Sequence, residues 1–325
     1  MEPTRRLLLV INPISGTHGK TDLDRIVADR LGPAGYEVET AWTTCKGDAE
    51  NMAIRAAEQN YYGVIVAGGD GTVNEVACGL RNTSTALGIL PCGSGNGLAR
   101  HMGLGSDLEA GLKVIANGYI ADADFGSVNG RPFLCTCGVG FDAIVSERFS
   151  RQPRRGRISY IKSTFQEFVG YQPEEYRISL SDGSVITDKA FLVAVCNASQ
   201  YGNNAYIAPH ASIRDGLLDV TIIHSGSPIS TAMVGVDLLT GFIDHNMLID
   251  TFRTSALTIE RSKPGPIHAD GEPLDAPAKL DVECHAGGLR LFAPHREKEF
   301  RPILTPMQAL FEDVRIDLRN IIKHI

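Results

Sequence analysis

Residues 62–80 have the types and spacing of a phosphate-binding turn. A short run of Val and Ile at 64–67 precedes Gly68-Gly69-Asp70-Gly71-Thr72, and apolar residues at helical spacing follow over 73–80. This order predicts a buried strand, a glycine turn and a helix that starts near residue 73. Glycines permit positive φ and let a phosphate approach backbone amides, and the helix N-terminus favours an anion.

Asp70 is the residue that a simple anion site does not explain. A carboxylate repels a phosphate unless a divalent cation lies between them, so the turn is a candidate Mg-nucleotide site. The alternative interpretation is a tight βα turn whose Asp caps the helix, because Gly and Asp are common turn residues.

Two further glycine-containing loops follow predicted strands. Asn12-Pro13-Ile14-Ser15-Gly16 comes after an apolar run at 7–11, and Pro91-Cys92-Gly93-Ser94-Gly95-Asn96 comes after one at 86–90. In a doubly wound sheet, the loops after different strands meet at the carboxyl edge, where ligands bind. Neither loop has Walker A spacing, and each alone could be an ordinary turn. Three such loops after three parallel strands predict a nucleotide-binding site.

The elements that would position these loops follow two patterns. Up to residue 121, apolar runs alternate with helical patterns, which predicts βαβ units and a parallel sheet covered on both faces. From 122 to 302, short apolar runs and turns are typical of a mainly antiparallel β-sandwich. We therefore expect an α/β fold with a doubly wound nucleotide-binding domain at 1–121, a β-rich domain at 122–302 and a C-terminal helix at 303–325. The expected β-rich strands include 133–138, 256–261, 279–283 and 289–292.

Composition limits the possible partners and the compartment. At 325 residues and a formal net charge of −7, the chain lacks the basic balance of proteins that bind nucleic acid through bulk charge. No run of about 18 apolar residues occurs without a charge, so no transmembrane segment is expected. Seven cysteines, an odd number in a long chain, indicate free thiols in a reducing compartment, which predicts a cytoplasmic protein.

Residues 148–162 form a basic segment in an otherwise acidic chain. The segment contains five arginines and Lys162 and no acidic residue, and apolar residues at helical spacing follow it. One interpretation is a basic amphipathic element that contacts an anionic membrane surface. The other is a solvated loop before an ordinary core-facing helix.

Together these motifs resemble the diacylglycerol kinase catalytic family, which includes bacterial lipid kinases and the sphingosine and ceramide kinases. The resemblance covers most of the chain. Four segments carry it in order: Asn12 to Gly16, Gly68 to Val76, Gly93-Ser94-Gly95-Asn96 and Asp270-Gly271-Glu272.

The resemblance implies ATP and Mg²⁺ as cofactors and names the residues that would hold them. Asp70 would be linked to the Mg²⁺ ion. In the related bacterial lipid kinases a second, structural metal is held at positions that match Ser212, Asp215 and Leu217. The implied ATP contacts are Asn12, Pro13, Ser15, Gly16, Thr43, Gly68, Gly69, Asp70, Gly71, Thr72, Asn74, Gly93 and Ser94.

The acceptor side is implied by Asp270-Gly271-Glu272, which matches the position of the general base for a lipid hydroxyl. Asp270 is the preferred base and Glu272 the alternative. A purely structural interpretation is an Asp-Gly turn between strands at 257–260 and 279–283, with His268 structural as well. Asp142 matches an acidic residue that meets the lipid head group in sphingosine kinases, although a structural role, in which it caps or pairs with the Arg154-Arg155 region, is equally open.

The expected function is an ATP-dependent lipid kinase of phospholipid metabolism that phosphorylates a lipid hydroxyl, first of all that of diacylglycerol. The Gly-Ser-Gly-Asn form at 93–96 is nearer to sphingosine and ceramide kinases, so a sphingoid base or ceramide is the alternative acceptor. A NAD kinase and a non-catalytic lipid-sensing relative also stay open. We expect a peripheral protein at the inner membrane surface, which could form a homodimer.

Overall fold

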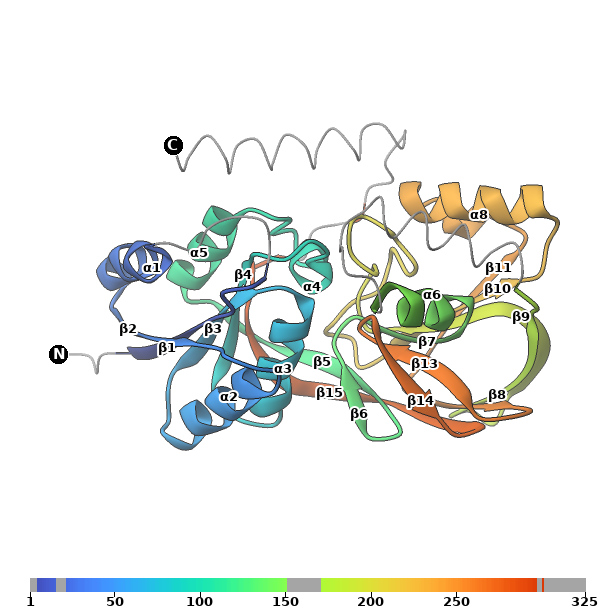
Figure 1. Ribbon diagram of the computed structural model, residues 1–325, viewed down its shortest axis with the longest axis horizontal. Coiled ribbons are helices and arrows are strands. Elements are labelled where there is room, and N and C mark those ends of the chain that lie inside the picture. The colour runs from blue at the N-terminus through green and yellow to red at the C-terminus, as the bar shows by residue number, and fades with distance from the viewer. Residues whose placement is uncertain (1–4, 16–21, 151–170, 297–299, 301–325) are drawn as a thin grey trace. The chain divides into compact units, whose positions relative to one another are not determined.

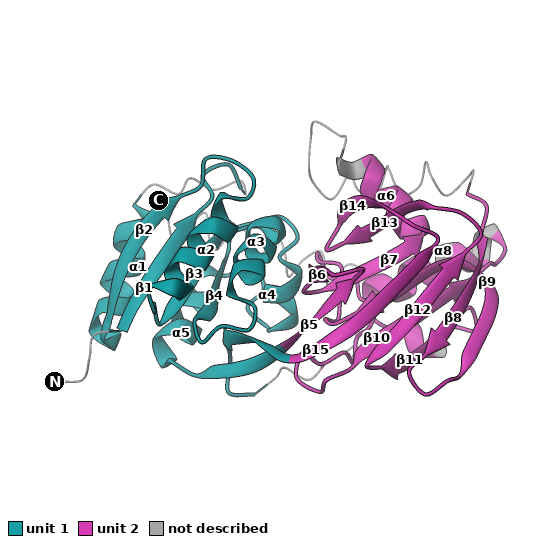
Figure 2. Cartoon of the chain, turned by 90° about the horizontal axis from the view of Figure 1, so that it is seen from below, with its two compact units in different colours: residues 1–123, 287–299, 310–325 teal, residues 124–286, 300–309 magenta. Residues whose placement is uncertain are grey.

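The computed structural model describes residues 5–15, 22–150, 171–296 and 300. The chain divides into two compact units, coloured separately in Figure 2. Unit 1 contains the described residues up to Ala123 together with 287–296, and unit 2 contains Asp124–Ala286 with Phe300. The basic segment therefore lies outside the described residues except for its start at 148–150, and so does the expected C-terminal helix.

Unit 1 is built on a parallel sheet with the strand order β2-β1-β3-β4. β1 pairs with β2 on one side and β3 on the other, and β4 pairs with β3, all in parallel. The connection from β1 leads to β2 on one side of it, and the connection from β2 leads back across β1 to β3 on the other side. The strand order therefore reverses here, and a topological switch point lies between β1 and β3. The strands are β1 (Arg5–Ile11), β2 (Tyr36–Trp42), β3 (Gly63–Gly68) and β4 (Ala86–Pro91).

Helices cover both faces of this sheet (Figure 1). α2 packs on α3, and α1 packs on α5. Leu9, Ile65 and Leu90 are fully buried in the core between the sheet and the α1 and α5 layer, as expected for strands with both faces covered. The helices are α1 (Leu23–Leu31), α2 (Asp48–Glu58), α3 (Asp70–Leu80), α4 (Gly97–His101) and α5 (Leu108–Asn117), with a 3-10 turn η1 (Gly32–Ala34).

Unit 2 is an antiparallel β structure in which the long strand β9 (Val185–Cys196) is central. Its first half pairs with β8, and its second half lies between β7 and β10. Side chains alternate across it: Val193 and Val195 enter one core, while Leu192 and Ala194 enter another beside α6 and α8. Both faces of its apolar run are therefore buried.

The remaining elements of unit 2 follow the same antiparallel scheme, and the expected α/β fold with a C-terminal β-sandwich is confirmed. The other strands are β5 (Ile120–Val128), β6 (Arg131–Phe133), β7 (Thr136–Gly140), β8 (Glu174–Leu180), β10 (Leu218–His224), β11 (Ile249–Thr254), β12 (Ala256–Arg261), β13 (Gly265–Ala269), β14 (Glu272–Ala276) and β15 (Lys279–Phe292). The helices are α6 (Phe141–Ser150), α8 (Pro228–Thr240) and the 3-10 turn η2 (Ile243–His245).

Three expectations about elements were wrong. The runs at 279–283 and 289–292 are one strand, β15, which begins in unit 2 and ends in unit 1, where Leu291 pairs with Leu87 of β4. The run at 133–138 is divided between β6 and β7. The strands that flank the Asp-Gly turn are β13 and β14, which form a hairpin. In the sequence this hairpin follows the first strand expected to flank the turn and precedes the second. Pro266 and Pro273 within these short strands weakened the strand signal.

No helix among the described residues is long and apolar enough to cross a membrane.

Candidate nucleotide and acceptor sites

The loops after β1 and β3 are joined by a side-chain hydrogen bond at the switch point. Asn12 Nδ2 donates to Thr72 Oγ1 over 2.9 Å, and the Asn12 amide donates to the carbonyl of Ala67 at 3.2 Å. Ser15 Oγ donates to the Asn12 carbonyl at 3.2 Å. Two of the predicted nucleotide-binding loops are therefore fixed to one another. Gly16, also predicted to contact the nucleotide, lies outside the described residues.

Asp70 connects the loop after β3 to the loop after β4. Its Oδ2 accepts from the amide of Asn96 at 2.9 Å, and its Oδ1 accepts from the amide of Gly97 at 2.6 Å. These amides start α4, so the carboxylate caps a neighbouring helix instead of its own. A Cβ on Gly95 would lie 2.6 Å from Asp70 Oδ2, which explains the glycine there.

The motif glycines allow close approach between segments. A Cβ on Gly93 would lie 2.5 Å from the Cα of Gly69, and one on Gly68 would lie 2.7 Å from the Cβ of Thr72. Glycine permits positive φ, but Gly68, Gly69 and Gly71 do not adopt it, and Gly69 has φ −93°. Gly68 and Gly93 are needed because a side chain at either position would not fit.

The N-terminus of α3 supplies the anion-binding geometry expected of the turn. The helix begins at Asp70 instead of residue 73, and the amides of Thr72 and Val73 bond to the Gly69 carbonyl. The first-turn amides of Asp70 and Gly71 precede the first intrahelical donors, and the helix dipole favours an anion beside them. In the part of the chain that the structure describes, nothing lies within 4 Å of a Cβ built on Gly71.

The other predicted nucleotide contacts surround this turn in unit 1. Thr43 is buried, and its amide donates to the carbonyl of Ile11 at 3.0 Å, which places it beside the end of β1. The next loop is held by Asp48, which accepts from the Thr44 amide and hydroxyl at 2.7 Å; these bonds lower the pKa of Asp48. Asn74 lies in α3 one turn after Asp70, and Ser94 is exposed.

Asp270 of unit 2 lies in the β13–β14 turn with φ 50° and is anchored by backbone amides. Its Oδ2 accepts from Leu134 at 2.7 Å, and its Oδ1 accepts from Cys135 at 2.8 Å and Thr136 at 3.0 Å. Its own amide donates to the Thr136 carbonyl at 2.8 Å. The side chain therefore fixes the turn to the start of β7.

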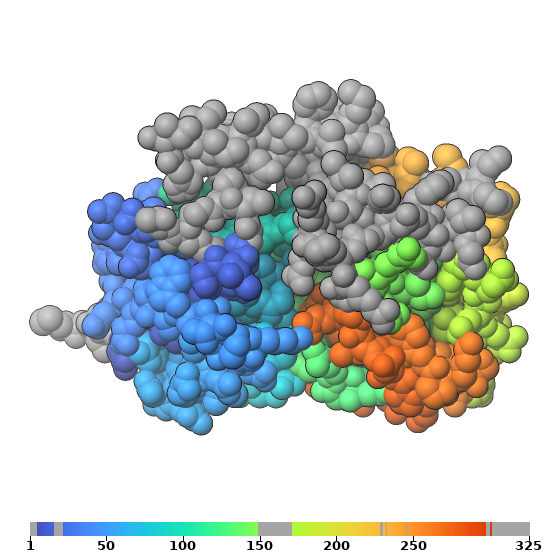
Figure 3. All heavy atoms as spheres, in the orientation of Figure 1, coloured from blue at the N-terminus to red at the C-terminus, as the bar shows by residue number. Residues whose placement is uncertain are grey.

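Glu272, two residues later, has a different environment. Its Oε2 pairs with Nη2 of Arg131 at 2.7 Å, and 38% of its side chain is exposed. In Figure 3 the orange β13–β14 hairpin lies at the surface beside the green segment that contains α6, which packs on β13 and β14. Arg131 was not found from the sequence, because nothing local relates it to a turn 141 residues away.

Asp142 and His268 form a buried pair beneath the same turn. Asp142 Oδ2 accepts from Tyr201 Oη at 3.0 Å and from His268 Nε2 at 3.1 Å, and Oδ1 accepts from the Ala143 amide at 2.8 Å. The Gly271 amide approaches His268 Nδ1 at 3.4 Å, which places the imidazole proton on Nε2. Residue exposures of 8% for Asp142 and 1% for His268 favour a structural role of Asp142 over a head-group contact, with Tyr201 and His268 as partners; Arg154 and Arg155, the partners expected from the sequence, lie outside the described residues.

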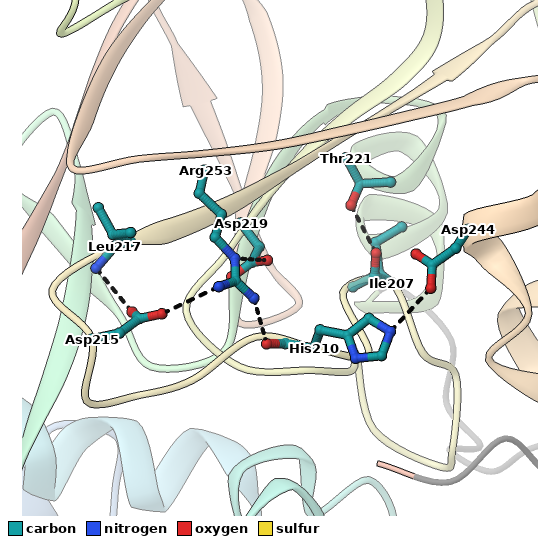
Figure 4. A network of polar contacts seen from close by, with 8 residues as sticks. All are labelled: Ile207, His210, Asp215, Leu217, Asp219, Thr221, Asp244 and Arg253. Carbon is teal, nitrogen blue, oxygen red and sulfur yellow. Dashed lines mark hydrogen bonds and ion pairs between the residues drawn. The ribbon is translucent and has the colours of Figure 1, made fainter. Parts of the chain in front are cut away.

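The positions matched to a second metal lie in the loop before β10, and two of them, Asp215 and Leu217, are drawn in Figure 4. Asp215 Oδ1 accepts from the Leu217 amide at 3.1 Å, and Ser212 Oγ accepts from the Arg214 amide at 3.2 Å. Arg253 of β11 lies beside Asp215, with its Nη1 3.7 Å from Asp215 Oδ2. Among the described residues no group of three or more His, Cys, Asp or Glu could hold a metal ion.

Comparison with known proteins agrees with this two-unit arrangement. The diacylglycerol kinase catalytic domain model matches residues 6–128, and the YegS C-terminal NAD kinase beta sandwich-like domain model matches residues 135–293. A solved structure from Bacillus anthracis strain Sterne, assigned as a diacylglycerol kinase, has a TM-score of 0.75 at 25% identity and covers 90% of this chain and 98% of its own.

Two curated relatives extend the comparison to nearly the whole chain. A Pseudomonas aeruginosa PAO1 protein assigned as a YegS-like lipid kinase is 31% identical over 268 residues, which are 80% of this chain and 86% of the relative. The diacylglycerol kinase of Bacillus subtilis strain 168 is 28% identical over 274 residues, 82% of this chain and 90% of the relative. The chain belongs to the lipid kinase family that carries the diacylglycerol kinase catalytic domain.

Proposed function

We propose that this protein transfers the γ-phosphate of ATP to a lipid hydroxyl and that diacylglycerol is the acceptor. One observation carries the nucleotide part: the loops after β1, β3 and β4 are bound to one another at the switch point of a parallel sheet. In such sheets the switch point is where nucleotides bind. The Asn12–Thr72 and Asp70–Asn96 hydrogen bonds are the contacts that hold the three loops together.

In this proposal unit 1 binds and orients the phosphates. The first-turn amides of α3 at Asp70 and Gly71 donate to phosphate oxygens, and the glycines at 68, 69 and 93 keep side chains out of the space between the loops. Asp70 fits a Mg²⁺ role, because this ion is commonly bound by one or two carboxylates and the substrate phosphates. The backbone amides of Asn96 and Gly97 hold the Asp70 carboxylate in position. When bound, Mg²⁺ would neutralise charge on the transferring phosphoryl group.

We propose Glu272 as the group that accepts the proton of the lipid hydroxyl. The contacts favour it over Asp270, the residue preferred from the sequence, because both oxygens of Asp270 already accept from backbone amides. Glu272 is partly exposed, and the pair that it forms with Arg131 is exposed as well. A base must be able to reach a substrate hydroxyl, which an exposed carboxylate can do without unfolding a turn.

The surroundings of Asp142 support diacylglycerol over a sphingoid base. A sphingoid amine would need a carboxylate to pair with, and the Asp142 carboxylate is buried and accepts from Tyr201, His268 and Ala143. Diacylglycerol has no amine and makes no such demand. The Gly-Ser-Gly-Asn loop, which favours a sphingoid acceptor by resemblance, lies in unit 1 and is explained by the Gly69–Gly93 approach.

An assay with labelled ATP tests this proposal. The full chain would be offered diacylglycerol, monoacylglycerol, a sphingoid base, ceramide, phosphatidylglycerol and NAD in mixed micelles, with and without Mg²⁺. We expect Mg²⁺-dependent label in phosphatidic acid. Label in NADP, in a sphingoid phosphate or in ceramide phosphate as the main product would replace the proposed acceptor, and absence of label in every product would refute the kinase proposal.

We also propose transient contact with the inner membrane surface, because the proposed acceptor is a membrane lipid. The basic segment 148–162 is the candidate contact. Replacement of Arg154 and Arg155 by Glu should weaken sedimentation with anionic vesicles, in a salt-dependent way. Salt-insensitive binding that is unchanged in the variant would contradict this contact.

A further inference from the structure

Arg253 lies at the place where the family resemblance puts a structural metal ion. It belongs to β11 and stands directly opposite Asp219 of β10 in the antiparallel register. This cross-strand position directs the two side chains to the same face of the sheet, where opposite charges stabilise each other. The loop that contains Ser212, Asp215 and Leu217 leads directly into β10.

The guanidinium of Arg253 contacts three separate parts of the chain (Figure 4). Its Nε donates to Asp219 Oδ1 at 3.0 Å, and its Nη2 donates to the carbonyl of His210 at 2.7 Å. Its Nη1 lies 3.7 Å from Asp215 Oδ2. One cation thus joins two parts of the loop to the following strand.

The residues present do not fit a divalent ion at this place. The Ser212 hydroxyl accepts from Arg214, Asp215 Oδ1 accepts from Leu217, and the remaining Asp215 oxygen faces Arg253. A metal bound to that oxygen would stand within a few ångströms of a guanidinium that stays protonated at every relevant pH, and the two cations would repel each other.

The charge of Asp219 shows why a cation is needed. Its side chain is 14% exposed, and its Oδ2 is buried with no hydrogen-bond partner among the described residues. Removal of the guanidinium would take away the cation that both carboxylates, Asp215 and Asp219, face.

We propose that Arg253 is a built-in cation that replaces the structural metal ion of this loop, so that the fold of unit 2 does not depend on a divalent metal there. The proposal concerns structural support only and is independent of which lipid the protein phosphorylates. It applies to relatives only where an arginine occupies the same position opposite the aspartate of the strand.

Thermal unfolding of the full, nucleotide-free chain tests the proposal. Wild type, Arg253→Gln and Arg177→Gln would each be measured in chelator, in millimolar Mg²⁺ and in millimolar Ca²⁺. Arg177 is the matched control, because it is also a strand arginine that pairs across strands with a carboxylate, Glu260, at 2.8 Å. An Asp70→Asn background repeats each measurement without the proposed Mg²⁺ ligand of unit 1.

We expect the wild-type melting temperature to be the same in chelator and in either metal. Arg253→Gln should lower it by about 3–8 °C in chelator, more than Arg177→Gln does, and a divalent ion should recover part of that loss in this variant alone. If the Asp70→Asn protein with Arg253 intact melts at a higher temperature in divalent metal than in chelator, the proposal is overturned. So would an Arg253→Gln protein that behaves like Arg177→Gln.

A direct measurement covers the case in which Arg253→Gln does not fold. The Asp70→Asn protein with Arg253 intact would be dialysed against Ca²⁺ or Mg²⁺, and its metal content would be determined by elemental analysis. Substoichiometric metal supports the built-in cation, and one tightly held equivalent refutes it. Arg253→Lys, which keeps the charge but loses the fork of donors, should fold and should remain insensitive to metal.

Discussion

The sharpest test of the acceptor site compares Asp270→Asn with Glu272→Gln. The sequence preferred Asp270 as the base, whereas the structure has its carboxylate anchoring the turn to three backbone amides. The two substitutions are isosteric, remove one negative charge each and lie two residues apart. They therefore separate an effect on folding from an effect on proton transfer.

The expected size of each effect follows from the contacts. In Asp270→Asn the side-chain oxygen can still accept from Cys135 and Thr136, but the new amide group faces the N–H of Leu134, so one buried donor loses its partner. One unsatisfied buried donor costs about 1–3 kcal/mol, and the two remaining bonds lose their ionic component. Asp270→Ala would leave three amides unpaired at about 3–9 kcal/mol, which approaches the whole stability of a typical protein.

Glu272→Gln should change stability little. Its pair with Arg131 is 38% and 45% exposed, and exposed pairs contribute about 0–1 kcal/mol. Loss of a general base typically lowers turnover by about 10²–10⁴-fold. We therefore expect a stable protein with very low kcat for Glu272→Gln, and a less stable protein with much of its kcat for Asp270→Asn below its own melting transition.

Urea unfolding and steady-state kinetics at low temperature measure both quantities on the same samples. The reasoning is refuted if Asp270→Asn keeps wild-type stability and loses turnover at least a hundredfold, because Asp270 would then be the base. It is equally refuted if Glu272→Gln keeps full turnover. The rate of both variants would be measured over a range of Mg²⁺-ATP concentrations. An indirect effect on nucleotide binding would then be detected as a change in the KM for ATP.

Three further predictions concern other parts of the two sites. Gly93→Ala should destabilise the protein by about 1–3 kcal/mol and raise the KM for ATP, because its Cβ would lie 2.5 Å from the Gly69 Cα. Gly32→Ala is the control and should be tolerated, because a Cβ there meets nothing within 4 Å among the described residues. Gly138→Ala should destabilise similarly in urea unfolding, since its Cβ would lie 2.2 Å from Asp142 Oδ2; wild-type stability would show that the pair can move aside. The pKa of Asp48 is lowered in the fold, so its contribution to stability is present above the unfolded carboxyl pKa and is lost as pH falls. Asp48→Asn should therefore flatten the dependence of the free energy of unfolding on pH in that acid range. An unchanged dependence would contradict this.

The sequence predicted the elements that depend on local pattern. The strands at 7–11 and 63–67 were found because both faces of them are buried, which requires uninterrupted apolar runs. The nucleotide loops were found because a glycine next to such a run is visible in the chain itself. The helix of the central turn was placed three residues late, because Gly71 and Thr72 look like turn residues but occupy the first turn of α3.

Features that the sequence could not predict depend on partners far along the chain. Gly93 is a glycine because its backbone approaches that of Gly69, and no local rule distinguishes that need from positive φ. Arg131, Tyr201 and Arg253 have ordinary neighbours in sequence, and their importance comes from carboxylates that lie at least 34 residues away. The β13–β14 hairpin was missed because each strand has only five residues and contains a proline.

The acidic residues of the motifs share one structural property that bears on how their roles should be tested. Asp70, Asp142 and Asp270 each accept hydrogen bonds from backbone amides in or beside a loop. At Asp70 and Asp270 the donors belong to a distant segment of the chain, so each carboxylate also holds that segment in place. A variant at Asp70 or Asp270 is therefore expected to change stability as well, so a loss of activity alone does not identify a catalytic group. A catalytic role can be assigned only where the variant keeps its stability and its KM for ATP while kcat falls.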